Sequence, residues 1–134
     1  MKIILNKCYG GFSLSKEAYE LYAKKKGWTL YPYYDSSEDN FTTFKKGDSS
    51  YLTYYFIEDF GDEVSKNKID WSKNLHLNYK YRNDPILIEV VEELGEKANS
   101  SYSDLVVVDI PDNMDYVIDN YDGIETLHER VREW

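Results

Sequence analysis

The 134 residues are predicted to form a single α+β domain, residues 1–134, in which a mixed β-sheet is covered on one face by two main helices. Strand-like runs lie near both ends of the chain, and two segments with helical spacing, about residues 15–26 and 85–99, lie between them. A chain of this length is long enough to bury one core. Residues 28–81, between the helices, are rich in tyrosine and are expected to form a variable β and loop region with a β-hairpin.

The first strand and first helix are marked by their boundaries. A strand is expected over Lys2 to Tyr9, because an apolar run is followed by two glycines. Ser15 is the expected N-cap of the helix, and Glu17 lies in the first turn, where the helix dipole favours an acid. Lysines 24–26 followed by Gly27 give the typical end of a helix.

The middle of the chain has weaker signals. Two β-rich runs, Phe41 to Phe44 and Tyr51 to Ile57, flank the loop-forming residues 45–50, which predicts a hairpin. Trp28 to Tyr34 is expected to be extended, and the polar segment Glu58 to Asp70 is expected to be a loop. Leu75 to Tyr81 alternates apolar and polar residues, which predicts a half-buried strand.

The second helix has the clearest signal in the sequence. Asp84 is a good N-cap, and Pro85 falls at the first helical position, where its missing N–H costs nothing. Apolar residues then recur at helical spacing and make one continuous stripe: Leu87, Val90, Val91, Leu94 and Ala98.

The C-terminal third is predicted to be mainly β-structure. Leu105 to Ile110 is rich in β-branched residues and is stopped by Pro111. Asp115 to Tyr121 alternates along its length, and Asp122-Gly123 is a turn signal. Residues 124–134 are compatible with a short helix or with a final strand.

Composition and charge exclude several classes of partner. The net charge is −9, and an acidic body repels nucleic-acid polymers. No apolar run approaches the roughly 18 residues of a membrane span, and the apolar run near the N-terminus is too short for a secretory signal. A single cysteine forms no internal disulfide, so a reducing cytoplasm is the expected compartment.

One segment near the start is suited to binding a small anion. Asn6 to Ser15 carries a strand end, two glycines and the beginning of a helix, whose first N–H groups are unpaired. Arg82 precedes the second helix and could clamp a phosphate, or pair with Asp84 or a helix carboxylate. The alternative for the glycine segment is a tight turn followed by an ordinary serine cap. The candidate ligand-binding residues are Asn6, Gly10, Gly11, Phe12, Ser13, Ser15 and Arg82.

No catalytic, metal-binding or cofactor-binding residue is expected. Cys8 lies inside the predicted strand, which favours a buried structural thiol over a nucleophile. Two histidines, His76 and His128, without a cysteine cluster give no zinc signature. Asp119, Asp122 and Glu125 lie close in sequence but lack the spacing of a calcium loop, so a solvated acidic edge is favoured.

The chain resembles a family of small, uncharacterised bacteriophage proteins over about its first 25 and last 55 residues. The matching segments are Asn6-x-Cys8-Tyr9-Gly10-Gly11-Phe12-Ser13-Leu14-Ser15, Arg82-Asn83-Asp84-Pro85, Val91-Glu92-Glu93-Leu94-Gly95-Glu96-Lys97-Ala98-Asn99, Ile110-Pro111-Asp112, Tyr121-Asp122-Gly123-Ile124-Glu125 and Arg132-Glu133-Trp134. The resemblance implies a viral protein in the cytoplasm of a host bacterium, acting against host defence. It implies no catalytic residue.

Three functions follow from the residues and the resemblance together. The first is sequestration, without turnover, of a phosphorylated nucleotide immune signal such as a cyclic dinucleotide or an ADP-ribose-type molecule, with Phe12 or a tyrosine stacking on the base. The second is an acidic inhibitor or nucleic-acid mimic that blocks a host protein, since residues 104–134 hold nine acidic and two basic residues. The third is a small nucleotide hydrolase. A homo-oligomer is compatible with each, because such proteins often use symmetric interfaces.

Overall fold

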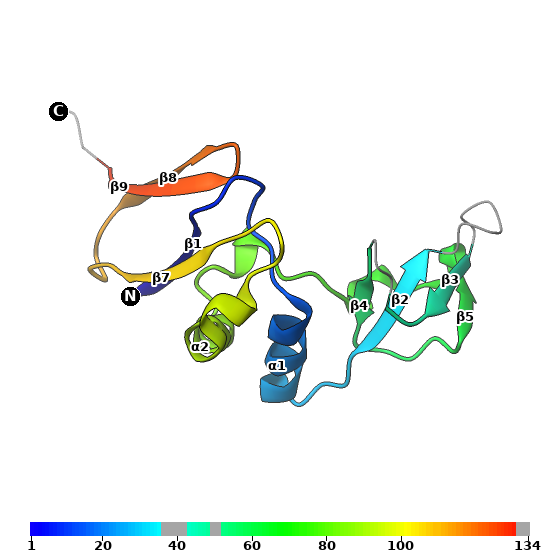
Figure 1. Ribbon diagram of the computed structural model, residues 1–134. Helices are drawn as coiled ribbons and strands as arrows, with labels where there is room; N and C mark the ends of the chain where they lie inside the picture. The colour runs from blue at the N-terminus through cyan, green and yellow to red at the C-terminus, as the bar shows by residue number, and fades with distance from the viewer. Residues whose placement is uncertain (36–42, 49–51, 131–134) are drawn as a thin grey trace. The chain divides into compact units, whose positions relative to one another are not determined.

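The computed structural model describes residues 1–35, 43–48 and 52–130, and confirms the α+β class (Figure 1). The described residues form two α-helices and nine strands. The chain divides into two compact units. The first joins Met1–Tyr22 to Leu77–Trp134, and the second is Ala23–His76, close to the variable region expected at 28–81.

The first unit contains two antiparallel strand pairs. β1 (Lys2–Asn6) pairs with β7 (Leu105–Asp109), and β8 (Tyr116–Tyr121) pairs with β9 (Ile124–Glu129) through a turn at 122–123. The strand predicted over Leu105 to Ile110 is therefore confirmed, and residues 124–129 form a strand instead of a helix. β1 ends at Asn6, three residues earlier than expected, because the chain turns through 8–10.

The expected single mixed sheet is replaced by three sheets in which every pairing among the described strands is antiparallel. Parallel neighbours need a crossover, usually a helix, between two strands of the same sheet. Here each helix connects strands of different sheets: α1 (Lys16–Lys26) follows β1 and precedes β2, and α2 (Pro85–Leu94) follows β6 and precedes β7.

The boundaries of α1 match the prediction. The Ser15 hydroxyl accepts the Ala18 N–H at 3.1 Å and so caps the helix. At the other end Gly27 has a φ of +75°, its N–H donates to the Lys24 carbonyl, and the Trp28 N–H donates to the Ala23 carbonyl. These two hydrogen bonds close the last turn of the helix. They require a residue in the left-handed conformation, which glycine adopts easily.

The start of α2 is also confirmed, but its end differs. The Asp84 carboxylate accepts the N–H groups of Ile86 and Leu87 at 2.8 and 3.2 Å, with Pro85 at the first position. The α-helix ends at Leu94, and a 3-10 turn over Gly95–Ala98 replaces the expected last turn to residue 99. Leu87, Val90 and Val91 are buried, as their spacing predicted.

The second unit is a five-stranded antiparallel sheet in the order β5-β3-β2-β4-β6. Its strands are β2 (Tyr31–Asp35), β3 (Thr43–Lys46), β4 (Tyr54–Phe56), β5 (Glu63–Ser65) and β6 (Asn74–Leu75). The hairpin expected between β3 and β4 does not form, because the two strands pair with opposite edges of β2. Residues 41, 42 and 49–51 of that prediction lie outside the described ranges.

Two other expectations in this region are corrected. The predicted loop at Glu58 to Asp70 contains β5, which pairs with β3. The strand predicted over Leu75 to Tyr81 is limited to its first residue, and Tyr79–Tyr81 is a 3-10 turn capped by the Asn78 side chain. The Asn78 side chain accepts the Lys80 N–H. Asparagine favours turns through such local hydrogen bonds, so the segment forms a turn although its apolar and polar residues alternate as in a strand.

The core of the second unit is aromatic. Tyr33, Phe44, Phe56 and Ile69 are buried there, with ring centroids 5.7 Å apart for Tyr33 and Phe56. The Tyr33 hydroxyl donates to the Gly61 carbonyl and accepts the Phe60 N–H, both at 2.8 Å. The buried phenol thus keeps its hydrogen bonds, and burial raises its pKa. In the described part of the chain, neither helix has the length and hydrophobicity to cross a bilayer.

Candidate functional site

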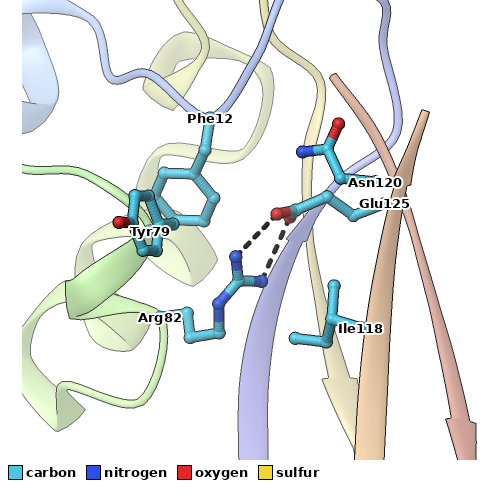
Figure 2. A pocket seen from close by; sticks show the side chains of 6 residues that line it. All are labelled: Phe12, Tyr79, Arg82, Ile118, Asn120 and Glu125. Carbon is cyan, nitrogen blue, oxygen red and sulfur yellow. Dashed lines mark hydrogen bonds and ion pairs between the residues drawn. The ribbon is translucent and has the colours of Figure 1, made fainter. Parts of the chain in front are cut away.

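The first unit contains a pocket of about 430 Å³, drawn in Figure 2. Its walls come from three separate stretches of the sequence. The lining side chains are Phe12, Tyr79, Arg82, Ile118, Asn120 and Glu125. Ile118 and Asn120 come from β8 and Glu125 comes from β9. Figure 2 shows the Glu125 carboxylate reaching the head of Arg82, with the Asn120 amide on the far side of Glu125. Two of the seven predicted ligand-binding residues, Phe12 and Arg82, therefore line one pocket.

A buried ion pair forms part of the pocket wall. The Arg82 Nη1 and Nη2 groups donate to Glu125 Oε1 and Oε2 at 3.1 and 2.6 Å, as the dashed lines in Figure 2 mark. The two side chains are only 11% and 4% exposed. Two parallel charge-assisted bonds fix both groups and neutralise the pair. Arg82 therefore pairs with Glu125 of β9, and not with Asp84 or a helix carboxylate, the partners that the sequence suggested.

The same ion pair completes the hydrogen bonding of β1. On the edge of β1 that faces away from β7, the Asn6 N–H donates to Glu125 Oε1 at 2.8 Å. The Ile4 carbonyl accepts from Arg82 Nη1, and the Ile4 N–H donates to the Arg82 carbonyl, both at 3.0 Å. A buried strand edge needs such partners. Arg82 and Glu125 supply them in place of a neighbouring strand.

Aromatic rings supply the other part of the wall. The Arg82 guanidinium carbon lies 5.3 Å from the centroid of the Phe12 ring, within the range of a cation–π contact. Tyr79 lies on the 3-10 turn and is 57% exposed. A half-exposed ring at the rim of a pocket offers a face on which a planar ligand stacks.

Several polar groups at the pocket still have capacity for a ligand. The Asn120 Oδ1 accepts the Gly123 N–H at 3.0 Å, whereas its Nδ2 has no hydrogen-bond partner among the described residues. Arg82 uses three of its five N–H donors in the bonds described above. The remaining groups are donors, so the pocket is suited to a ligand rich in acceptor atoms.

The other five predicted ligand residues, Asn6, Gly10, Gly11, Ser13 and Ser15, do not line this pocket. Asn6 is 0% exposed, and its amide is fully used. The Nδ2 donates to the carbonyls of Cys8 and Gly123 at 2.9 and 2.7 Å, and the Oδ1 accepts the Asp104 N–H at 2.9 Å. Through these hydrogen bonds Asn6 connects its own segment to Asp104 and to Gly123. Asn6 does not line the pocket.

The Gly10-Gly11 turn packs against a second turn. The Gly10 N–H donates to the Asp122 carbonyl at 3.0 Å, so this amide is not available to an anion. A Cβ on Gly123 would lie 2.6 Å from the Gly11 nitrogen, and one on Gly10 would lie 2.5 Å from the Tyr102 carbonyl oxygen. Gly10 and Gly123 thus allow a close backbone contact that a side chain at either position would block.

The two serines are bonded to the segment after α2. The Ser13 hydroxyl lies 2.5 Å from the Ser100 hydroxyl, and the Ser15 hydroxyl donates to the Lys97 carbonyl at 2.5 Å. Ser15 also caps α1, as described. These hydroxyls point toward residues 97–103 and do not line the pocket.

Four pocket residues were missed by the sequence reasoning: Tyr79, Ile118, Asn120 and Glu125. Glu125 had been assigned to a solvated acidic edge, which is wrong, because it is 3% exposed. Its position inside the Tyr121-Asp122-Gly123-Ile124-Glu125 motif was the signal that could have identified it. Among the described residues, no group of three or more His, Cys, Asp or Glu side chains is placed to hold a metal ion. No protein-family model, curated protein or solved structure matches the chain.

Proposed function

We propose that this protein binds and sequesters a small phosphorylated nucleotide, with the base in the pocket lined by Phe12, Tyr79 and the Arg82–Glu125 pair. One observation carries the proposal: aromatic rings and unused donors converge on a neutral, rigid ion pair. The pocket volume of about 430 Å³ falls in the usual range for small-molecule sites, roughly 300–1,000 Å³.

The charge of the pocket supports a ligand that is anionic at one end only. Glu125 neutralises the charge of Arg82. The floor of the pocket therefore accepts an uncharged planar group without the desolvation penalty of a free ion. The unused N–H groups of Arg82 and Asn120 are left for acceptor atoms of the sugar, the base or a phosphate. In this proposal the phosphate is contacted by these donors, and the Gly10 N–H, which donates to the Asp122 carbonyl, takes no part.

Binding without turnover is part of the proposal. Glu125 is the acid of the pocket, and its oxygens already accept three hydrogen bonds from Arg82 and Asn6. A general base needs a free lone pair directed at the proton that it removes. Glu125 is instead held as a fixed acceptor, which favours storage of an intact ligand. In the setting that the phage resemblance implies, the stored ligand is an immune signal of the host.

The test is a melting-temperature screen with cyclic dinucleotides, cyclic ADP-ribose isomers, ADP-ribose and NAD, followed by heat release and identification of the bound molecule. A ligand at a hundred times its Kd stabilises the folded state by about 2.7 kcal/mol. Intact ligand after a clear shift supports sequestration. Altered ligand supports the hydrolase alternative, and no shift with any of the nucleotides contradicts the proposal.

Two variants locate the binding. Phe12→Ala removes one stacking ring and is expected to weaken nucleotide binding by roughly 1–3 kcal/mol. Tyr102→Ala is the matched control, because Tyr102 is an aromatic residue of the same unit that is 71% exposed and does not line the pocket. Equal losses in the two variants would place the binding elsewhere.

One observation favours the second candidate, an acidic inhibitor of a host protein. Tyr9, Tyr102 and Tyr121 are 62%, 71% and 72% exposed. Tyr9 and Tyr121 adjoin Gly10 and Asp122, whose backbones are hydrogen-bonded, and the Gly10 backbone also lies close to Tyr102. The three exposed tyrosines therefore lie near one pair of turns. Tyrosine is enriched at interface hot spots. A host-protein complex of this kind should weaken steeply as salt rises, whereas a stacked nucleotide should not.

A further inference from the structure

The Arg82 guanidinium keeps one complete pair of hydrogen-bond donors for a ligand. Its Nη1 group donates one N–H to Glu125 Oε1 and one to the Ile4 carbonyl, and its Nη2 group donates one N–H to Glu125 Oε2. The Nε–H and the second Nη2–H have no acceptor in the described part of the chain. Because the guanidinium is planar, these two N–H groups are neighbours and point the same way from one edge.

The surroundings of this free edge favour an uncharged ligand group. The Arg82 and Glu125 side chains are 11% and 4% exposed, and together they are neutral. A phosphate or carboxylate at the free edge would add a second anion beside Glu125 and leave a net negative charge in a largely buried place. An uncharged group that carries two neighbouring acceptors avoids this cost.

Aromatic rings lie beside the same guanidinium. Figure 2 shows the head of Arg82 between the Glu125 carboxylate and the rings of Phe12 and Tyr79. The guanidinium carbon lies 5.3 Å from the centroid of the Phe12 ring. Three hydrogen bonds hold the orientation of the guanidinium, so the free donors are fixed next to a stacking surface. This combination suits a planar, uncharged ring with two acceptors on one edge.

Guanine has such an edge and adenine does not. Guanine presents the acceptors N7 and O6 side by side, and arginine commonly binds both at once. Adenine presents N7 beside an N6 amino group, which would place a donor against a donor of Arg82. Asparagine is the usual two-bond partner of adenine, through its Oδ1 and Nδ2. At Asn120, however, the Oδ1 already accepts the Gly123 N–H at 3.0 Å.

We propose that the pocket selects guanine over adenine, with Arg82 donating one N–H to O6 and one to N7 of the base. This inference rests on the nucleotide-binding function proposed above and names the base within it. Glu125 acts as a positioning residue, because it fixes the guanidinium without contacting the base edge. The Asn120 Nδ2 is then the donor left for a phosphate. Guanine-containing cyclic dinucleotides are therefore favoured over ADP-ribose-type ligands.

The test is calorimetric titration of the unmodified chain with two matched series of probes. One series is GDP, IDP and ADP, and the other is cyclic di-GMP, cyclic di-IMP and cyclic di-AMP. Within a series the phosphates are the same and only the base changes. Hypoxanthine, the base of the inosine probes, keeps O6 and N7 but lacks the amino group of guanine. We expect guanine and hypoxanthine probes to bind alike, and adenine probes to bind about 5- to 150-fold more weakly.

The possible outcomes separate this inference from the proposed function. Equal affinities for guanine and adenine probes overturn the selection of guanine and leave nucleotide binding standing. A preference for guanine that hypoxanthine does not share assigns recognition to the amino group, and also overturns the Arg82 contact. No binding in either series overturns the inference and the proposed function together.

Two variants assign the selection to Arg82. Arg82→Lys keeps a positive charge beside Glu125 but has no planar pair of donors, so the ratio of the adenine and guanine Kd values should fall close to one. Asn120→Ala is the matched control in the same pocket. It should weaken both series and leave that ratio unchanged. A folded Arg82→Lys variant that still prefers guanine contradicts the proposal, and the probe series on the unmodified chain decides the matter if the variant fails to fold.

Discussion

The two compact units are organised by different chemistry. In the first, a largely buried polar network of Asn6, Arg82 and Glu125 joins β1, β9 and the turn before α2. In the second, aromatic rings pack edge-to-face around Tyr33 and Phe56, and the polar groups sit mainly at the rim. Polar networks depend on each bond being present, whereas ring packing spreads the energy over many contacts. We therefore expect the first unit to be more sensitive to single polar changes.

The largest effect is expected from Glu125→Ala. The change leaves the Arg82 guanidinium and the Asn6 N–H without their acceptor inside the first unit. Breaking a buried ion pair by removing one partner costs about 3–5 kcal/mol. The free energy of unfolding of the first unit, measured by exchange of the β1 and β7 amides, should fall by that amount.

Glu125→Gln is the control for this change. It keeps an oxygen that can accept the Asn6 N–H but removes the charge, so its cost should lie below that of the alanine variant. A loss under about 1 kcal/mol for Glu125→Ala would mean that the pair is worth no more than a surface ion pair. The contrast between the two units would then disappear.

A smaller effect is expected from Tyr33→Phe in the second unit. The ring stays, but the Phe60 N–H and the Gly61 carbonyl lose their partner. Loss of part-buried hydrogen bonds such as these costs about 0.5–1.5 kcal/mol each, a change measurable by urea unfolding followed through tryptophan fluorescence. Tyr54→Phe, at a half-buried ring of the same cluster, should change stability by less than about 0.5 kcal/mol. Equal effects of the two changes would contradict a specific role for the Tyr33 hydroxyl.

The smallest predicted effect is a change in pH dependence. Burial, helped by the hydrogen bond to Asp84, raises the pKa of Tyr22 above its usual 10.0. The neutral phenol therefore stabilises the folded state fully below pH 10.0, and this contribution is lost as pH rises toward the higher folded pKa. Urea midpoints at rising alkaline pH should fall less steeply for Tyr22→Phe than for the unmodified chain. Parallel curves would show that Tyr22 does not titrate differently in the two states.

The elements that sequence reasoning predicted well are those with local signals. The caps at Ser15 and Asp84 and the glycine at 27 act on the residues beside them, so the helix boundaries could be read directly. The sheet of the second unit could not be predicted in this way. Nothing in the runs that became β3 and β4 specifies that both pair with β2 instead of with each other.

The site was predicted in part for the same reason. Phe12 and Arg82 were recognised by residue type beside turns and helix starts, and both line the pocket. Glu125 was not, because its role depends on a partner 43 positions away. Gly10 was selected for its backbone freedom, and the structure uses that freedom to pack against another turn.

The pairing of β1 with β7 also has a consequence for synthesis on the ribosome. Ile3 of β1 pairs with Val108 of β7, so β1 has no strand partner until about 105 further residues have been synthesised. At about 5–20 residues per second, roughly 5–20 seconds of translation separate the two. All of Ala23–His76 has been made before β7 exists, so the second unit can fold while the apolar Ile3-Ile4-Leu5 run is still unpaired. During this interval the unpaired Ile3-Ile4-Leu5 run is a segment at which the nascent chain is prone to aggregation.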